Sequence, residues 1–188
     1  MLVIPVYNAM LLPSTTVYLD PESIRRTTGR LPGVGDRVLL APIRENVEKS
    51  ALTADHLYPI GVTGTVSESP IQGAIAVKTE DRVNIENPIV LTDGTILAAG
   101  EHRPDEMDLT EDEEREHLEK LRADIFNFIR QSRMGNGLEM FITHMVHSVA
   151  DIATIASATL SISTEDRYGF LAEDSQKTRM EKLESMLY

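Results

Sequence analysis

The period of the hydrophobic pattern changes once along this chain, and this change limits the possible folds more than any other feature of the sequence. Up to about residue 100, short β-branched runs are separated by Gly, Pro and Asp, a pattern typical of strands. After residue 110, apolar residues recur every three to four positions, as in amphipathic helices. The sequence therefore predicts a strand-rich part, residues 1–104, followed by a helical part, residues 105–188.

The first part is expected to contain short, bent antiparallel strands that form a small closed or nearly closed barrel. The predicted strands are Leu2–Val6, Thr15–Leu19, Arg37–Ala41, Tyr58–Val66, Ala74–Lys78, Arg82–Glu86, Ile89–Thr92 and Thr95–Ala99. Asp93-Gly94 predicts a two-residue type I′ hairpin turn. Pro5, Pro59 and Pro88 cannot donate ladder hydrogen bonds, so we expect them at edges, strand starts or bulges.

The second part is expected to contain four helices. Thr110 and Glu113 have the spacing of a capping box, which predicts that the first helix begins there and ends before Gly135. The second helix is expected to present one apolar face made of Leu138, Phe141, Ile142, Met145, Val149, Ile152 and Ile155. Ser163 is expected to cap a short third helix.

The fourth helix is expected to open at Asp174 or Ser175. Its apolar side, which includes Met180 and Leu183, runs to the last residues without a Gly or Pro that would stop the helix. We therefore expect this helix to be cut at Tyr188 and to continue beyond it.

Charge and composition exclude several classes of function. Of the net charge of −12, much lies in residues 101–120, which hold ten acidic and three basic residues. No cluster of Lys and Arg is present, so we expect no nucleic-acid partner. The chain has no cysteine, and no apolar run approaches the ~18 residues of a membrane span. The first residues also lack the basic start of a signal peptide, which predicts a cytoplasmic protein without a membrane partner.

Motifs of catalysis or metal binding are incomplete. The segment Leu31–Arg37 resembles a phosphate-binding loop, but Asp36 stands where the motif needs lysine, so we expect a glycine turn. His144, His147 and Asp151 are spaced to share one face of a helix, yet no fourth ligand is evident. The sequence therefore predicts no catalytic residue, no metal site and no cofactor in this chain.

Several segments, taken in order, resemble the amino-terminal domain of the Lon ATP-dependent proteases. They are Ile4–Pro13, Gly35–Leu40, Asp55–Gly61, Leu118–Arg122, Ser163–Asp166 and Met180–Leu187. The chain departs from the family pattern at Pro21–Pro32, which is shorter than the helix that Lon domains usually place there and is broken by Gly29. The resemblance implies an α+β fold in which a PUA-like antiparallel pseudo-barrel precedes a helical bundle.

The resemblance also implies a function. The chain would be the substrate-recognition and assembly domain of a Lon-type serine protease, binding unfolded, damaged or tagged proteins in protein quality control. It would deliver them to ATPase and protease domains of the same parent chain, which forms a hexamer and uses ATP and magnesium. The chain itself would not be an enzyme, because it lacks the Walker A loop and the serine–lysine dyad. The alternative is a stand-alone adaptor or ligand-binding protein of the same fold with no ATPase attached.

Flexible methionine side chains suit surfaces that accept varied apolar segments, and the helical part is rich in methionine. We therefore predict substrate contacts at Met134, Met140, Phe141, Met145 and Met180. The alternative, that these methionines fill gaps between helices, stays open. Edge strands of the barrel could also pair with an extended substrate chain.

Overall fold

The computed structural model describes residues 1–131 and 146–187 and divides the chain into two compact units. The strand unit comprises residues Met1–Pro104 and Ser163–Ala172, and the helical unit comprises Asp105–Ile162 and Glu173–Tyr188. The sequence placed all of residues 105–188 in the helical part. In the structure, helix α5 (Thr164–Ala172) instead groups with the strands, because its buried side chains pack into their core.

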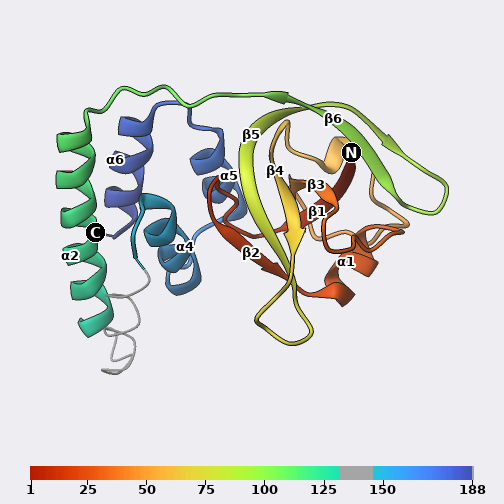
Figure 1. Cartoon of the computed structure of the whole chain (residues 1–188), viewed down its shortest axis with the longest axis horizontal. Helices are drawn as coiled ribbons and strands as arrows, with labels where there is room; N and C mark the ends of the chain where they lie inside the picture. The colour runs from red at the N-terminus through yellow and green to blue at the C-terminus, as the bar shows by residue number, and fades with distance from the viewer. Residues whose placement is uncertain (132–145, 188) are drawn as a thin grey trace. The chain divides into compact units, whose positions relative to one another are not determined.

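The strand unit is built on one six-stranded sheet in the order β2-β5-β4-β3-β1-β6 (Figure 1). The strands are β1 (Leu2–Tyr7), β2 (Thr16–Leu19), β3 (Arg37–Ile43), β4 (Ile60–Ser67), β5 (Ile75–Val90) and β6 (Ile96–His102). An additional pairing of β5 with β6 turns five of them into a barrel-like ring, and β1 with β3 is a parallel pair. The ring is unevenly closed, because the register of β1 with β6 covers two residue pairs in the described chain. The predicted α+β fold with a small pseudo-barrel is confirmed, but the prediction of an antiparallel barrel is corrected, because β1 and β3 run parallel and the sheet is mixed.

Strand β5 corrects the prediction of three separate strands at residues 74–92. It runs through the polar residues around Glu80 and through Asn87-Pro88, which the sequence pattern presented as breaks. Its pairing shifts register opposite Val62–Gly64 on β4 and again between Glu86 and Ile89, where Asn87 has a φ of 48°. Pro88 therefore lies in a bulge, as expected for a residue without a ladder donor.

Close approach between β4 and β5 depends on Gly64. A Cβ atom there would lie 2.6 Å from the carbonyl oxygen of Lys78 on β5, closer than any real contact. A side chain at this position would push the two strands apart, so glycine is required by the packing rather than by the backbone angles.

The hairpin between β5 and β6 also differs from the prediction. Leu91 donates to the Thr95 carbonyl at 2.8 Å, and Gly94 donates to the Leu91 carbonyl at 3.0 Å. Gly94 has a φ of 83°, whereas Asp93 does not have a positive φ. A type I′ turn needs positive φ at both central residues, so the connection is a three-residue loop in which Gly94 takes the left-handed position.

Strand β3 lies between two hydrophobic cores, because its residues alternate between the two faces of the sheet. Val38 and Leu40 belong to one core, which α1 (Pro21–Thr27) and α5 also enter. Leu39 and Ala41 belong to the other core, which contains residues of β1, β5 and β6. All four side chains are fully buried. The continuous apolar run of β3 reflects burial on both faces.

Buried Arg82 of β5 fixes the end of α5 within the strand unit. Its side chain is 2% exposed and donates to the carbonyl oxygens of Leu171 at 2.9 Å and Pro104 at 3.2 Å. Leu171 lies in the last turn of α5, where carbonyl groups lack helical partners and the helix dipole favours a cation. The other end of α5 begins at Ser163, whose hydroxyl accepts from the amide of Asp166 at 3.0 Å as predicted.

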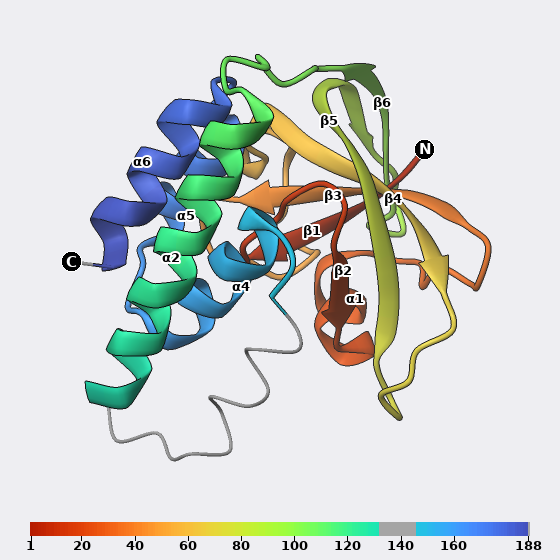
Figure 2. The ribbon, with the colours of Figure 1, turned by 60° about the vertical axis from the view of Figure 1, so that its left-hand side comes forward.

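The helical unit contains α2 (Glu111–Gln131), α4 (Val149–Thr159) and α6 (Gln176–Leu187), which lie side by side in Figures 1 and 2. The capping box at the start of α2 is confirmed, with both Thr110–Glu113 hydrogen bonds present. The predicted second helix is wrong at residues 146–148, which are not helical. There Ser148 and Asp151 form a capping box that starts α4. Residues 138–145 of that prediction lie outside the described residues.

Polar contacts fasten the start of the helical unit to α6. Arg179 donates to both carboxylate oxygens of Asp105, at 3.0 and 2.9 Å. Asp108 accepts from the Ser175 hydroxyl and from the amide of Lys177 at the first turn of α6. Ser175 itself caps the helix by accepting from the amide of Thr178 at 2.9 Å, which confirms the predicted start.

Candidate functional site

A groove of about 530 Å³ lies in the strand unit, between the second half of β1, the end of β2, helix α1 and the loop residues 46–48. Ile4 and Ile24 are buried along its wall, with 0% and 2% of their surface exposed. Tyr7 and Tyr18 line the groove and are 43% and 45% exposed. The rest of the lining is mixed, with partly exposed Val6 and Leu19 beside polar residues, and ligand sites commonly combine apolar and aromatic surface with a few polar groups.

Uneven closure of the ring produces this groove. Strand β6 pairs with β1 at Leu2 and Val3, and the register does not extend to the residues of β1 that line the groove. Within the described residues, β2 pairs with β5 alone and stands at one end of the strand order. The groove is therefore flanked by two strands whose facing edges are not joined by a described strand. Figure 2 shows β2 beside β5, with α1 following it.

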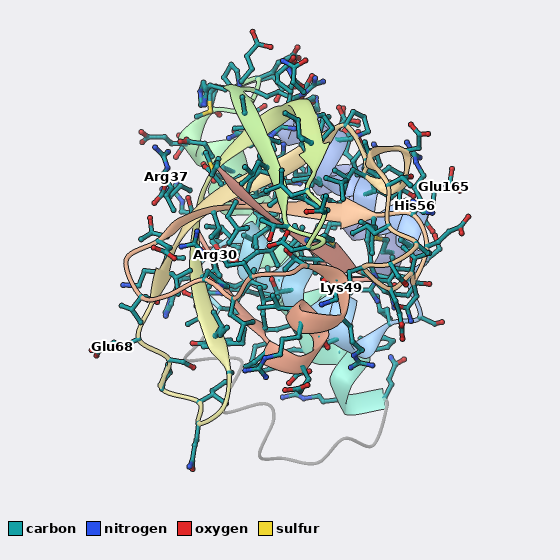
Figure 3. The ribbon with its side chains drawn as sticks, turned by 90° about the vertical axis from the view of Figure 1, so that its right-hand side faces the viewer. Arg30, Arg37, Lys49, His56, Glu68 and Glu165 are labelled. Atoms are coloured by element: carbon teal, nitrogen blue, oxygen red, sulfur yellow. The ribbon has the colours of Figure 1, made fainter. Side chains whose placement is uncertain are left out.

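The charged side chains that line the groove include both signs, and Asp20 among them already accepts hydrogen bonds within the protein. Asp20 accepts from the backbone amide and from the hydroxyl of Ser23, both at 2.9 Å, and these hydrogen bonds hold the pKa of Asp20 below its usual value. Arg26 and Glu48 also line the groove. Lys49 is labelled beside α1 in Figure 3, and its backbone amide donates to the carbonyl oxygen of Arg26 at 2.6 Å, which ties the lining loop to the helix.

A stack of three side chains holds the start of that loop. Arg44 lies 4.3 Å from the ring centre of Tyr58, which in turn stacks on Tyr168 of α5 with ring centres 3.9 Å apart. Burial raises the pKa of Tyr168 above its ordinary value. A guanidinium over an aromatic face is attracted by the ring quadrupole, so the loop leaves β3 in a fixed direction.

Comparisons with known proteins place the chain in a family. Residues 1–188 match the family described as the ATP-dependent protease La (LON) substrate-binding domain. The chain belongs to this family. No match was found among curated protein sequences.

Two solved structures share the fold of this Lon substrate-binding domain. The N-terminal domain of the Mycobacterium avium complex Lon protease has a TM-score of 0.66 at 15% identity, and the match covers 99% of this chain and 96% of that one. A Lon N-terminal domain protein from Xanthomonas campestris has a TM-score of 0.52 at 17% identity, covering 98% and 96%. The resemblance inferred from the sequence is thereby confirmed.

Of the five predicted substrate contacts of the Lon domain, one lies within the described residues. Met134, Met140, Phe141 and Met145 lie outside the described residues. Met180 lies on α6 and is 4% exposed, packed inside the helical unit. The methionine hypothesis stays a prediction.

The groove residues were missed by sequence reasoning, although a signal was present. Thr16–Leu19 alternates between exposed and partly buried side chains, and this alternation puts an aromatic ring on the outside at Tyr18. Aromatic residues are enriched in protein interfaces, so an exposed tyrosine on a short strand is a candidate contact residue. That Tyr18 lines the same groove as the end of β1 depends on long-range pairing, which the local pattern does not reveal.

Of the three possible metal ligands, His144 lies outside the described residues, and Asp151 takes part in a helix cap with His147 and Ser148. Asp151 accepts from the amides of His147 and Ser148, both at 3.0 Å, so its carboxylate caps α4. No group of three potential ligands was found within residues 1–131 and 146–187.

No helix within the described residues 1–131 and 146–187 is long and apolar enough to cross a membrane.

Proposed function

We propose that this Lon substrate-binding domain holds exposed apolar segments of unfolded polypeptides in the groove between β1 and β2. In this proposal it presents them to the ATPase and protease domains of a Lon-type protease and performs no chemistry itself. The observation that carries the proposal is an open groove of mixed lining with two half-exposed tyrosines, in a chain whose whole length matches a substrate-binding family.

The properties of the groove suit transient binding of many sequences. Its partly exposed Val6, Leu19 and Val47 offer apolar surface to any apolar side chain, because the hydrophobic effect is non-directional. The charged residues Asp20, Arg26 and Glu48 differ in sign, so no single charge is selected. A small contact area gives weak binding, which allows a motor to pull the bound segment away.

Binding of a fluorescent, permanently unfolded polypeptide to the 188-residue chain tests this proposal. Replacing Tyr18 by Ser should weaken binding about fivefold or more, since an aromatic side chain at the centre of an interface typically contributes over 1 kcal/mol. Val34→Ser is the matched control, because Val34 is 68% exposed and does not line the groove. Equal affinity of the two variants and the unaltered chain would exclude the groove.

A photo-crosslinking map separates the groove from the methionine hypothesis. An unfolded substrate carrying a photoreactive group should label the accessible groove residues of β1 and β2, at positions 6–7 and 18–19. Labelling confined to the segment that contains Met134, Met140, Phe141 and Met145 would instead support the methionine surface and reject the groove.

The proposed link to a protease is tested on the gene. A Walker A motif encoded in frame after Tyr188 would support a parent protease. A stop codon directly after Tyr188 would support the stand-alone adaptor.

A further inference from the structure

The outer edge of β2 carries backbone groups that point away from the sheet. The amide of Thr79 on β5 donates to the carbonyl of Thr15 at 2.8 Å, and the amide of Thr15 donates to the Thr79 hydroxyl at 2.9 Å. The backbone groups of Thr15 therefore face β5. Because successive residues of a strand turn their N–H and C=O groups to opposite edges, those of Val17 also face β5. Those of Thr16 and Tyr18 face the other edge.

The facing edge of β1 is chemically different. Met1 and Ala98 exchange two hydrogen bonds, at 2.9 and 3.1 Å, so odd-numbered residues of β1 direct their backbone groups toward the β6 side. Beyond the last pair with β6, the next such residue is Pro5, which has no N–H. Proline at this position blunts the edge against strand pairing. Of the two strands that flank the groove, β2 is thus the one able to accept another strand.

We propose that the bound polypeptide adds to the outer edge of β2 as an extra strand, hydrogen-bonded to Thr16 and Tyr18. This inference rests on the proposed function and specifies its substrate class: extended segments with apolar side chains at alternate positions. Side chains of neighbouring strands lie on the same face in step. Val17 and Leu19 pack against the core, whereas Thr16 and Tyr18 are exposed, so every second residue of the added strand faces the apolar side.

Substitution of Thr16 tests the edge without breaking the sheet. Thr16→Pro removes an outward N–H while leaving the groups that pair with β5, and proline is tolerated at such edge positions. It should weaken binding of a nine-residue fluorescent peptide of alternating Val and Ser about tenfold, through one lost hydrogen bond and the added ring. Thr16→Val keeps the N–H and the β-branched shape, and should bind like the unaltered chain. Thermal unfolding of both variants checks that the fold persists.

Peptide chemistry gives a second test that uses the unaltered protein. An added strand of either direction turns alternate N–H groups toward β2. N-methylation at one alternating set of peptide positions should therefore abolish binding, and methylation at the other set should leave it within about twofold, since those groups make no bond to β2. A peptide of equal composition with its valines grouped together should bind more weakly than the alternating peptide.

The outcomes distinguish this inference from the proposed function. If both methylated sets and both peptide patterns bind equally well, and Thr16→Pro has no effect, strand addition is wrong while the groove can still bind substrates. If the alternating peptide does not bind the unaltered chain, the inference and the groove both fail. Concentration-dependent dimerisation that Thr16→Pro abolishes and the peptide does not compete with would assign the edge to a second copy and overturn the proposal.

Discussion

The two units of this domain are stabilised in different ways. In the strand unit, β3 is buried on both faces between two apolar cores. Backbone hydrogen bonds between neighbouring strands join five strands into the ring. In the helical unit, the ends of the elements carry the specific contacts: a bidentate Asp105–Arg179 ion pair, capping boxes, and Asp108 at the start of α6. The stability of the strand unit should therefore fall most when a buried side chain is made smaller. The stability of the helical unit should fall most when a helix cap or a charged contact is removed.

The largest effect is expected from a cavity in the strand unit. Leu39→Ala removes a fully buried side chain of β3 and should lower the free energy of unfolding by about 3 kcal/mol, through lost burial and an unfilled cavity. Urea denaturation followed by circular dichroism measures the change. Val34→Ala is the control at a 68% exposed site, and should stay within about 0.5 kcal/mol of the unaltered chain. Similar values for the two variants would contradict burial of the face of β3 that carries Leu39.

A smaller effect is expected from a cap in the helical unit. Ser175→Ala removes the hydroxyl that accepts from the amide of Thr178 and donates to Asp108, and should lower the free energy of unfolding by about 1 kcal/mol. Ser185→Ala, at an exposed position inside α6, should change it by no more than a few tenths of a kcal/mol, since alanine favours the helix interior. Hydrogen exchange should locate the loss at the first turn of α6. A uniform loss over both units would count against a local cap.

Short-range chemistry was predictable from the sequence, whereas long-range closure was not. The starts of α2, α5 and α6 depend on side chains that reach three residues along the chain, and each was placed correctly. The start of α4 was missed although Ser148 and Asp151 have the same spacing, because the apolar stripe ran through them.

Strand β5 shows why the rest was out of reach. Its polar middle and Asn87-Pro88 predict breaks locally, but pairing with β4, β2 and β6 carries the strand across them. The groove arises from the same non-local pairing, since it exists where β6 stops covering β1. Side-chain spacing along one segment contains no information on where a distant strand ends.

Acidification should produce the smallest change in stability, and it should affect the two units at different pH values. The Ser175 hydroxyl lowers the pKa of Asp108, the Thr110 amide lowers that of Glu113, and Lys182 lowers that of Glu173, from ordinary values of 3.8 for Asp and 4.5 for Glu. A carboxyl group with a lowered pKa in the folded state binds fewer protons than it does in the unfolded chain. It therefore contributes stability above its ordinary pKa, and this contribution is lost as the pH falls through the folded pKa.

The helical unit should consequently begin to lose stability as the pH falls below about 4.5, with further loss below about 3.8. In the strand unit the pKa values of Asp20 and Asp93 are also lowered, but by hydrogen bonds to Ser23 and Thr95 close by in the chain, whereas the bonds of Asp108 reach to the start of α6. Hydrogen exchange, corrected for intrinsic rates, should show α6 losing protection at a higher pH than β3. Asp108→Asn should flatten the acid response of α6, since an amide does not titrate in this range. Simultaneous loss in α6 and β3 would show that the two units unfold as one.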